Sequence, residues 1–199
     1  MATVITPNQF ECELLTGIKI RTSADIVRTF AHFHALGIPT VIITSLEDLH
    51  DSPFDDPDMI YMVASQQQQQ QQQQQHAGGG GAAAAASEAQ AQAEPDMFMI
   101  SVPRIPAYFT GTGDLTAAML LAWLHNSGGS IVQAMEHACA TIQAVLARTW
   151  SCIQEAEAAG DASKASKELR LIQSAGDIVK PQIKVRAQAR CRWRASSPA

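Results

Sequence analysis

The sequence predicts an α/β protein, because helical patterns alternate with short, continuous apolar runs. Residues 40–44 (Thr-Val-Ile-Ile-Thr) form such a run, which is typical of a strand buried in a parallel sheet. The preceding residues 24–36 carry Ile26, Phe30 and Phe33 at helical spacing on one face. A helix joined to a buried strand by a short Gly-Ile-Pro link is one half of a βαβ crossover.

The other expected elements follow from the same patterns of apolar residues and turn formers. Residues 115–124 are nearly all apolar, so we expect this helix to be buried. The elements expected in chain order are a strand end at 1–5, a helix at 9–15 closed by Gly17, a helix at 24–36 capped by Ser23, strands at 40–44, 59–65 and 97–102, helices at 115–124 and 131–150, a polar loop at 156–167, a further helix at 167–174 and a last strand at 183–187.

A low-complexity segment interrupts this pattern between two expected strands. It holds ten glutamines (66–75), then His76, four glycines and five alanines. Such a composition cannot bury enough apolar surface to offset the entropy lost on ordering. We therefore expect residues 66–94 to be a disordered insertion in a hairpin loop, where added length costs little. A polyglutamine interaction element is the less favoured alternative, because the tract is short.

The composition argues against several classes of protein. The chain has 199 residues and a net charge of −5, without the basic excess that is typical of nucleic-acid binders. No apolar run reaches the length of a membrane span, and no signal peptide is evident. The four cysteines show no C-x-x-C spacing, so neither a zinc site nor a disulfide framework is indicated. We expect a cytosolic protein with reduced, mostly buried thiols and no nucleic-acid or membrane partner.

The segment Gly111-Thr112-Gly113-Asp114 is the first candidate for chemistry, since it directly precedes the apolar helix. Unpaired amides at a helix N-terminus form an anion site, and glycines let a phosphate approach the backbone closely. Asp114 could accept a hydroxyl proton beside that site, as phosphoryl transfer requires. The alternative is that Asp114 only caps the helix, and the two roles are compatible. No G-x-x-x-x-G-K-[ST] motif is present, which excludes a P-loop enzyme.

The second candidate is the turn Thr6-Pro7-Asn8 and the helix start that follows it. Asn8 and Glu11 are three residues apart, so an amide and a carboxylate can face the same way and organise hydrated Mg²⁺. The alternative is a capping box, with Asn8 as the N-cap and Glu11 as the third helical residue.

Four segments together resemble the pyridoxal kinases, and they occur in that family's order across almost the whole chain outside the low-complexity tract. The first is shared with hydroxymethylpyrimidine kinases, whereas Leu-Leu-Ala-Trp within the third, and the fourth, point to pyridoxal kinases specifically. The segments are Thr-Pro-Asn-Gln-Phe-Glu-x-Glu-Leu-Leu-x-Gly (6–17), Val-Ile-Ile-Thr-Ser (41–45), Phe-x-Gly-Thr-Gly-Asp-Leu-x-Ala-Ala-Met-Leu-Leu-Ala-Trp (109–123) and Glu-Leu-Arg-Leu-Ile-Gln-Ser (168–174).

The resemblance implies a ribokinase-like fold, with a central sheet and flanking helices, and ATP-dependent phosphorylation of the 5′-hydroxyl of pyridoxal in vitamin B6 salvage. It also implies pyridoxine and pyridoxamine as further substrates, Mg²⁺ and a monovalent cation (K⁺ or Na⁺) as cofactors, and a homodimer. The residues implied are Asp114 as the base; Gly111, Thr112, Gly113 and Asp114 as the anion hole beside the substrate; Asn8, Gln9, Phe10, Glu11, Thr44, Ser45, Ile105, Pro106, Ala107 and Thr112 as ATP-binding; Glu11 as an indirect Mg²⁺ ligand; and Thr6 and Thr44 as holding the monovalent cation.

Members of that family have a substantial N-terminal half before the Thr-Pro-Asn turn, which supplies early strands and most of the pyridoxal pocket. We therefore expect an N-terminally incomplete kinase domain at 1–190, interrupted by the insertion at 66–94 and followed by a disordered tail at 191–199. Two alternatives stay open: a truncated, non-catalytic fragment that acts by binding or dimerisation, and a hydroxymethylpyrimidine-type kinase. Members of the latter group commonly have a cysteine where this chain has Asp114.

Overall fold

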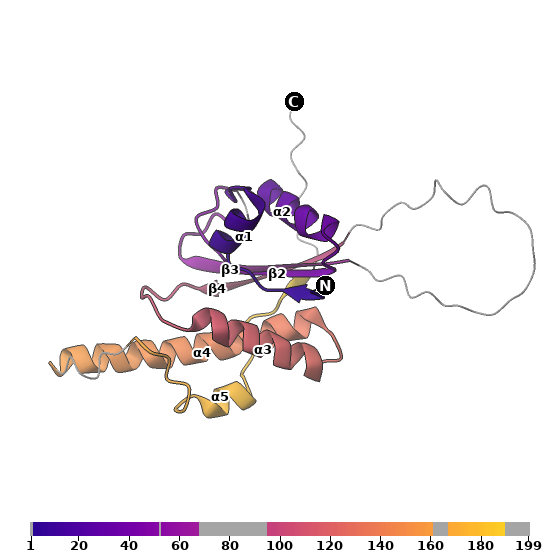
Figure 1. Cartoon of the computed structure of the whole chain (residues 1–199). Coiled ribbons are helices and arrows are strands. Elements are labelled where there is room, and N and C mark those ends of the chain that lie inside the picture. The colour runs from indigo at the N-terminus through magenta and orange to yellow at the C-terminus, as the bar shows by residue number, and fades with distance from the viewer. Residues whose placement is uncertain (1, 52, 68–94, 161–166, 190–199) are drawn as a thin grey trace, which may run out of the picture.

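The computed structural model describes residues 2–51, 53–67, 95–160 and 167–189. Within these ranges a five-stranded sheet in the order β1-β2-β3-β4-β5 lies between two helical layers, with α1 and α2 on one face and α3 and α4 on the other (Figure 1). The elements are β1 (Val4–Ile5), α1 (Gln9–Thr16), α2 (Ser23–Ala35), β2 (Thr40–Leu46), β3 (Met59–Gln66), β4 (Asp96–Pro103), α3 (Thr112–Asn126), α4 (Ile131–Ala158), α5 (Ala175–Val179) and β5 (Gln188–Ala189). The α/β fold class is confirmed.

The strand directions give the sheet a mixed topology. β1 pairs in parallel with β2, whereas the β2–β3, β3–β4 and β4–β5 pairs are all antiparallel. The expectation of a parallel environment for residues 40–44 therefore holds only toward β1. Because two antiparallel steps restore the original direction, β1, β2 and β4 all run the same way.

The predicted hairpin between β3 and β4 is confirmed, with Gln66 paired to Asp96 at its end. The amide of Gln67 donates to the carbonyl of Pro39, 2.9 Å away, just before β2 begins. Gln67 therefore lies where β2 starts, at the edge of the sheet opposite to the carboxyl end of β2. Residues 68–94, and with them nearly all of the predicted insertion, lie outside the described residues, as does the predicted tail at 191–199.

Apolar side chains fill both faces of the sheet, which explains why the strands read as nearly continuous apolar runs. Along β2, Val41 and Ile43 face α1 and α2, while Ile42 faces α3 and α4. The first cluster includes Cys12, Ile20, Ile26, Phe30, Phe33, Leu46, Leu49, Phe54, Tyr61, Val63 and Met99, and the second includes Met62, Ala64, Ile100, Val102, Leu120, Ile131, Ala134, Met135, Ala138 and Cys139.

The cysteines in the described ranges support the expectation of unpaired and mostly buried thiols. Cys12, Cys139 and Cys152 are free, and the first two are buried. Burial raises the pKa of Cys139 to about 12, and burial together with the charges of Glu11 and Glu13 does the same for Cys12. These two thiols therefore stay protonated and unreactive at neutral pH. Within the same ranges, no helix combines the length and apolarity needed to cross a bilayer.

The first two helices begin and end close to where the sequence predicts. α1 ends at Gly17, whose φ of +71° is the left-handed conformation that glycine tolerates best. α2 starts one residue earlier than expected, because Thr22 and not Ser23 is the N-cap. The Thr22 hydroxyl accepts from the amide of Asp25, and the Asp25 carboxylate accepts from the amide of Thr22.

Two later expectations about helices are wrong in part. α3 is buried only along the face that carries Leu115, Thr116 and Leu120, whereas Leu121 on another face is 72% exposed. An apolar pattern predicts burial but not which neighbour provides it, and within the described residues α3 packs mainly against α4. α4 continues to Ala158, so the loop expected from residue 156 starts later.

The last two predicted elements are corrected by the structure. Residues 167–174 are not a helix, because Glu168 bridges Thr110 and the amide of Arg170 donates to the Thr149 hydroxyl at 3.1 Å. Residues 183–187 are not a strand either. Ala187 donates its amide to the buried carboxylate of Glu136 at 3.0 Å, and the short strand β5 follows at Gln188–Ala189.

The largely buried Asp25 carboxylate at the start of α2 predicts how stability depends on pH. Burial raises the pKa of Asp25, but hydrogen bonds from the Arg21 amide, the Arg28 guanidinium and Thr22 outweigh that effect and lower the pKa below its usual range. A carboxyl group whose pKa is lower in the folded state stabilises the fold above its unfolded pKa. That contribution is lost as the pH falls through the folded pKa.

We therefore expect the free energy of unfolding to fall as the pH is lowered from about 5 to about 2. Asp25→Asn should cost about 1.5–3 kcal/mol at pH 7, since it weakens hydrogen bonds to a charged group. The variant should also show a smaller loss than wild type on acidification. Urea unfolding followed across pH measures both quantities, and an unchanged pH dependence in Asp25→Asn would contradict this role.

Candidate active site

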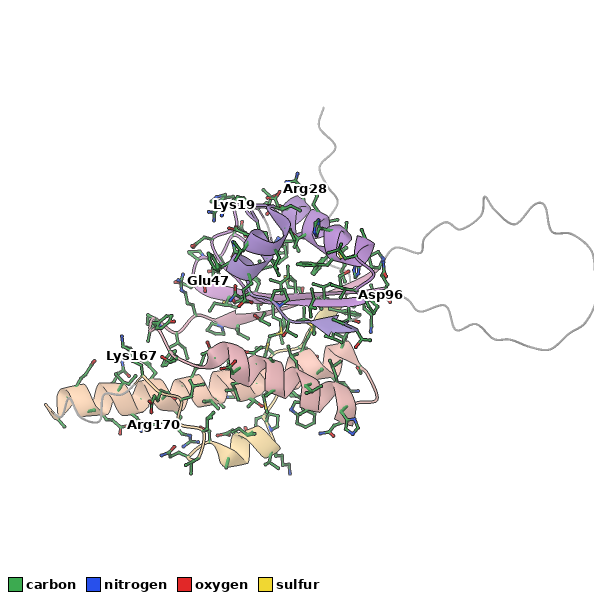
Figure 2. All side chains as sticks on the ribbon, in the orientation of Figure 1. Lys19, Arg28, Glu47, Asp96, Lys167 and Arg170 are labelled. Atoms are coloured by element: carbon green, nitrogen blue, oxygen red, sulfur yellow. The ribbon has the colours of Figure 1, made fainter. Side chains whose placement is uncertain are left out.

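The carboxyl ends of β1, β2 and β4 lie at one edge of the sheet, because these three strands share a direction. α1 begins four residues after β1 ends, and α3 begins nine residues after β4 ends. Figure 2 places Glu47, just beyond β2, and Asp96, at the start of β4, at opposite ends of the sheet. Every predicted site residue follows one of these three strand ends or forms the last part of β2, which is where open α/β sheets bind ligands.

Asn8 and Glu11 form a reciprocal capping box at the start of α1. The Glu11 amide donates to Asn8 Oδ1 at 2.8 Å, and the Asn8 amide donates to Glu11 Oε2 at 2.9 Å. The capping alternative is therefore confirmed. The second carboxylate oxygen, Glu11 Oε1, accepts no hydrogen bond from any other described residue and stays exposed. An exposed oxygen of this kind is suited to contact water molecules around Mg²⁺, which retains most of its hydration.

The Gln9 side chain joins three segments of the chain. Its Nε2 donates to the carbonyl of Ile20 at 3.0 Å, and its Oε1 accepts from the amide of Glu47 at 2.9 Å. Phe10, the next residue, is 70% exposed on the surface of α1. Gln9 thus fixes the first turn of α1 against the residue that follows β2, while Phe10 leaves its ring accessible.

Thr44 and Thr6 come from adjacent strand ends and are linked through Pro7. The amide of Thr44 donates to the carbonyl of Pro7 at 2.9 Å, and the Thr44 hydroxyl lies 3.5 Å from the same oxygen. Thr6, Thr44 and Ser45 are all half-buried. This contact places the end of β2 that carries Thr44 beside the loop that carries Thr6. These are the two threonines predicted to bind the monovalent cation.

The predicted adenine-side residues Ile105, Pro106 and Ala107 follow β4. Ala107 donates its amide to the carbonyl of Ile105 at 2.7 Å, which makes a tight turn. Directly before them, Arg104 forms an ion pair with Glu47, with Nη2 and Oε2 separated by 2.7 Å. The loop after β4 is therefore connected to the end of β2.

Gly111, Thr112, Gly113 and Asp114 form the beginning of α3. Gly111 is the N-cap, and its φ of +88° requires a residue that tolerates the left-handed region. The amides of Thr112, Gly113 and Asp114 donate to no other described residue, as expected for a first helical turn. A Cβ built on Gly113 would meet nothing within 4 Å, so the space beside the Cα atom of Gly113 is open.

Asp114 is the third residue of α3, not its N-cap, so the capping alternative for this residue is wrong. Its exposed carboxylate forms no hydrogen bond or ion pair within the described part of the chain. A free carboxylate beside unpaired amides combines a proton acceptor with an anion site. In the described ranges no group of three His, Cys, Asp or Glu side chains could hold a metal ion.

Residues 167–169 contact Thr110 and Gly111, directly before the first turn of α3. The amide of Thr110 donates to the carbonyl of Lys167 at 3.4 Å, and Thr110 bridges Glu168 in parallel. The Leu169 side chain lies 3.9 Å from the position of a Cβ on Gly111. Two segments that the sequence analysis singled out separately, 109–123 and 168–174, therefore meet at the start of α3.

Sequence reasoning missed the pair Glu47–Arg104 and the bridging role of Gln9. The available signal was an acidic residue three positions after the expected strand at 40–44 and a basic residue two positions after the expected strand at 97–102, at ends that face the same edge. That signal could not be used without the strand order, because β3 separates β2 from β4 in the sheet.

Comparisons with known proteins show what this chain is similar to. Residues 1–97 match the family model described as phosphomethylpyrimidine kinase. The chain is 36% identical over 194 residues to a pyridoxal kinase of Bos taurus and 34% identical over 189 residues to one of Arabidopsis thaliana. Each match covers 94% of this chain, but only 54% and 51% of the relative, respectively. The chain therefore spans about half the length of these relatives.

Solved structures show the same fold over the same share. A pyridoxal kinase of Leishmania donovani in complex with ADP and ginkgotoxin matches with a TM-score of 0.70 and 22% identity, over 95% of this chain and 51% of that one. Plasmodium falciparum PdxK with AMP-PNP and PL matches with a TM-score of 0.66 and 22% identity, over 94% and 49%. At these identities the likeness concerns the fold, which is that of about half of a pyridoxal kinase.

The backbone conformations of Gly111 and Gly113 predict different effects of an alanine substitution on stability. Gly111→Ala should destabilise the protein by about 1–2 kcal/mol, because alanine is strained at a positive φ. Gly113→Ala is the matched control, since it lies inside the helix with open space around it. It should leave stability unchanged or raise it by up to about 1 kcal/mol. Urea unfolding of both variants measures this, and equal destabilisation would contradict the assigned backbone conformation.

Proposed function

Because the chain is homologous to the pyridoxal kinases over about half of their length, we propose that it carries the nucleotide-binding and catalytic part of a pyridoxal kinase. The reaction is transfer of the γ-phosphate of ATP to the 5′-hydroxyl of pyridoxal, which gives pyridoxal 5′-phosphate. Pyridoxine and pyridoxamine are further candidate substrates. The observation that carries the proposal is the Asp114 carboxylate beside the first amides of α3, none of which has a hydrogen-bond partner within the described residues.

In this proposal Asp114 is the catalytic base. Its carboxylate accepts the proton of the 5′-hydroxyl as that oxygen forms a bond to the γ-phosphorus, while the bond from this phosphorus to the β–γ bridging oxygen breaks and ADP leaves. The amides of Thr112, Gly113 and Asp114 donate to the oxygens of the transferred phosphoryl group. Gly111 and Gly113 keep side chains out of the space that this group occupies.

ATP lies along the same edge of the sheet in this proposal. Asn8 and Glu11 approach its phosphates from the start of α1, and Thr44 and Ser45 approach from the end of β2. Ile105, Pro106 and Ala107 provide the adenine side, and Phe10 offers an exposed ring near the α1 turn. Mg²⁺ bound with ATP would neutralise charge on the β- and γ-phosphates, and Glu11 Oε1 is free to hold its water molecules.

The monovalent cation, if the protein uses one, would bind near Thr6 and Thr44. Their segments are held together by the hydrogen bond from the Thr44 amide to the carbonyl of Pro7, and both side chains are half-buried.

We also propose a homodimer as the functional assembly of the whole protein. The relatives extend beyond the part that this chain matches, which is 54% of one and 51% of the other.

A phosphomethylpyrimidine kinase is the second candidate, because the matching family model of that description covers residues 1–97. That range contains the α1 turn and β2 but not the α3 turn, so it bears on the nucleotide side only. Competition between pyridoxal and hydroxymethylpyrimidine as phosphate acceptors separates the two functions. Faster transfer to hydroxymethylpyrimidine would favour the second candidate.

The test is the formation of pyridoxal 5′-phosphate from ATP and pyridoxal, followed by absorbance, with wild-type protein beside Asp114→Asn. We expect kcat to fall roughly 10²–10⁴-fold in the variant, because the proton acceptor is lost, while the affinity for ATP stays near that of wild type. An Asp114→Asn variant with full activity would exclude the base role. Wild-type protein that folds but binds neither ATP nor pyridoxal would support the alternative of a non-catalytic fragment.

A further inference from the structure

Three loops at the carboxyl edge are joined by a continuous set of side-chain contacts. Gln9 connects the start of α1 to Glu47 through the 2.9 Å hydrogen bond from the Glu47 amide. The Glu47 carboxylate then reaches Arg104 at 2.7 Å, at the start of the loop after β4. The loops after β1, β2 and β4 are therefore linked through Gln9, Glu47 and Arg104, which we call the edge brace.

The ion pair in this brace crosses the end of a strand. β3 lies between β2 and β4, so the two pair-bearing loops are about 10 Å apart at the usual strand spacing. Only long side chains such as glutamate and arginine together can span that gap. The Arg104 amide also donates to the carbonyl of Asp58, just before β3, at 2.8 Å, which fixes the backbone from which the guanidinium extends.

Folding stability does not account for this ion pair. The Glu47 and Arg104 side chains remain 34% and 44% exposed, and exposed ion pairs contribute little to stability. What the pair does fix is the direction in which the chain leaves β4. Residues 105–107 follow Arg104 directly, and they are the proposed adenine side of the nucleotide site.

We propose that Gln9, Glu47 and Arg104 are positioning residues that set the spacing between the phosphate side of the nucleotide site at Asn8–Glu11 and its adenine side at residues 105–107. This inference rests on the proposed function, because it concerns how the same site holds ATP. It also changes the role of Gln9. Both polar atoms of its amide already contact the protein, so Gln9 acts through the loops and not as a ligand of ATP.

The test uses Gln9→Met, Glu47→Gln and Arg104→Met in the full chain, with Arg148→Met as the matched control. Arg148 pairs with Asp177 at 3.0 Å with exposures of 45% and 33%, nearly those of the brace pair, but it joins α4 to α5. Thermal unfolding verifies that each variant folds. Amide hydrogen exchange is then measured without ligand, and the dissociation constant of the Mg²⁺ complex of AMP-PNP is measured by titration.

We expect each brace variant to exchange the amides of Ile105 and Ala107, the two residues of this segment that carry an amide hydrogen, about three- to tenfold faster, and to bind AMP-PNP about three- to tenfold more weakly. The key readout is Gln9→Met, because residue 9 is remote in sequence from residues 105–107. A role confined to α1 would not change exchange there. The charge-reversed double variant Glu47→Arg with Arg104→Glu should restore both quantities, and Arg148→Met should alter neither.

Unchanged exchange of the Ile105 and Ala107 amides in Gln9→Met and Arg104→Met would overturn the brace. So would brace variants that bind AMP-PNP as tightly as wild type. If wild-type protein itself does not bind AMP-PNP, the proposed function fails, and the exchange data, which need no ligand, still decide whether the loops are coupled.

Discussion

The shared direction of β1, β2 and β4 is the constraint on which the rest of this structure depends. It brings three chain segments that are far apart in sequence to one edge of the sheet, and all the candidate site residues lie in the last part of β2 or in the segments that follow β1 and β4. The apolar clusters on both faces of the sheet maintain this alignment. A shift of one strand by a single residue would turn its buried side chains to the opposite face, so the packing also fixes the register of the site.

The two helices that begin at this edge contribute different chemistry. The first turn of α1 is closed by its own capping box, which leaves one oxygen of Glu11 exposed. The first turn of α3 begins at a glycine, which has no side chain to satisfy the amides that follow it. The first amides of α3 therefore offer donors to an anion, and Asp114 is placed in that same turn. Phosphoryl transfer depends mainly on positioning and charge stabilisation, and this arrangement supplies both.

Local signals predicted most of the fold. The capping box at Asn8 and Glu11 and the stop at Gly17 predicted α1 almost to the residue, and the apolar runs predicted three strands and the hairpin. The predictions failed where backbone amides donate to side chains that are distant in sequence. The amide of Arg170 donates to the Thr149 hydroxyl, and the amide of Ala187 donates to the Glu136 carboxylate. Neither 167–174 nor 183–187 therefore adopts the element that its pattern favours. The edge brace was missed for a related reason, since it depends on strand order.

The central claim is that nucleotide and alcohol substrate meet at the carboxyl edge of the sheet, beside Asp114. The most direct measurement is a titration of ¹⁵N-labelled protein with pyridoxal and the Mg²⁺ complex of AMP-PNP, followed by amide chemical shifts. The account predicts shifts for Asn8–Glu11 and for Thr112–Asp114, with little change at Gln67 and Asp96 at the opposite edge. Shifts confined to the opposite edge, or no shifts from either ligand, would contradict it.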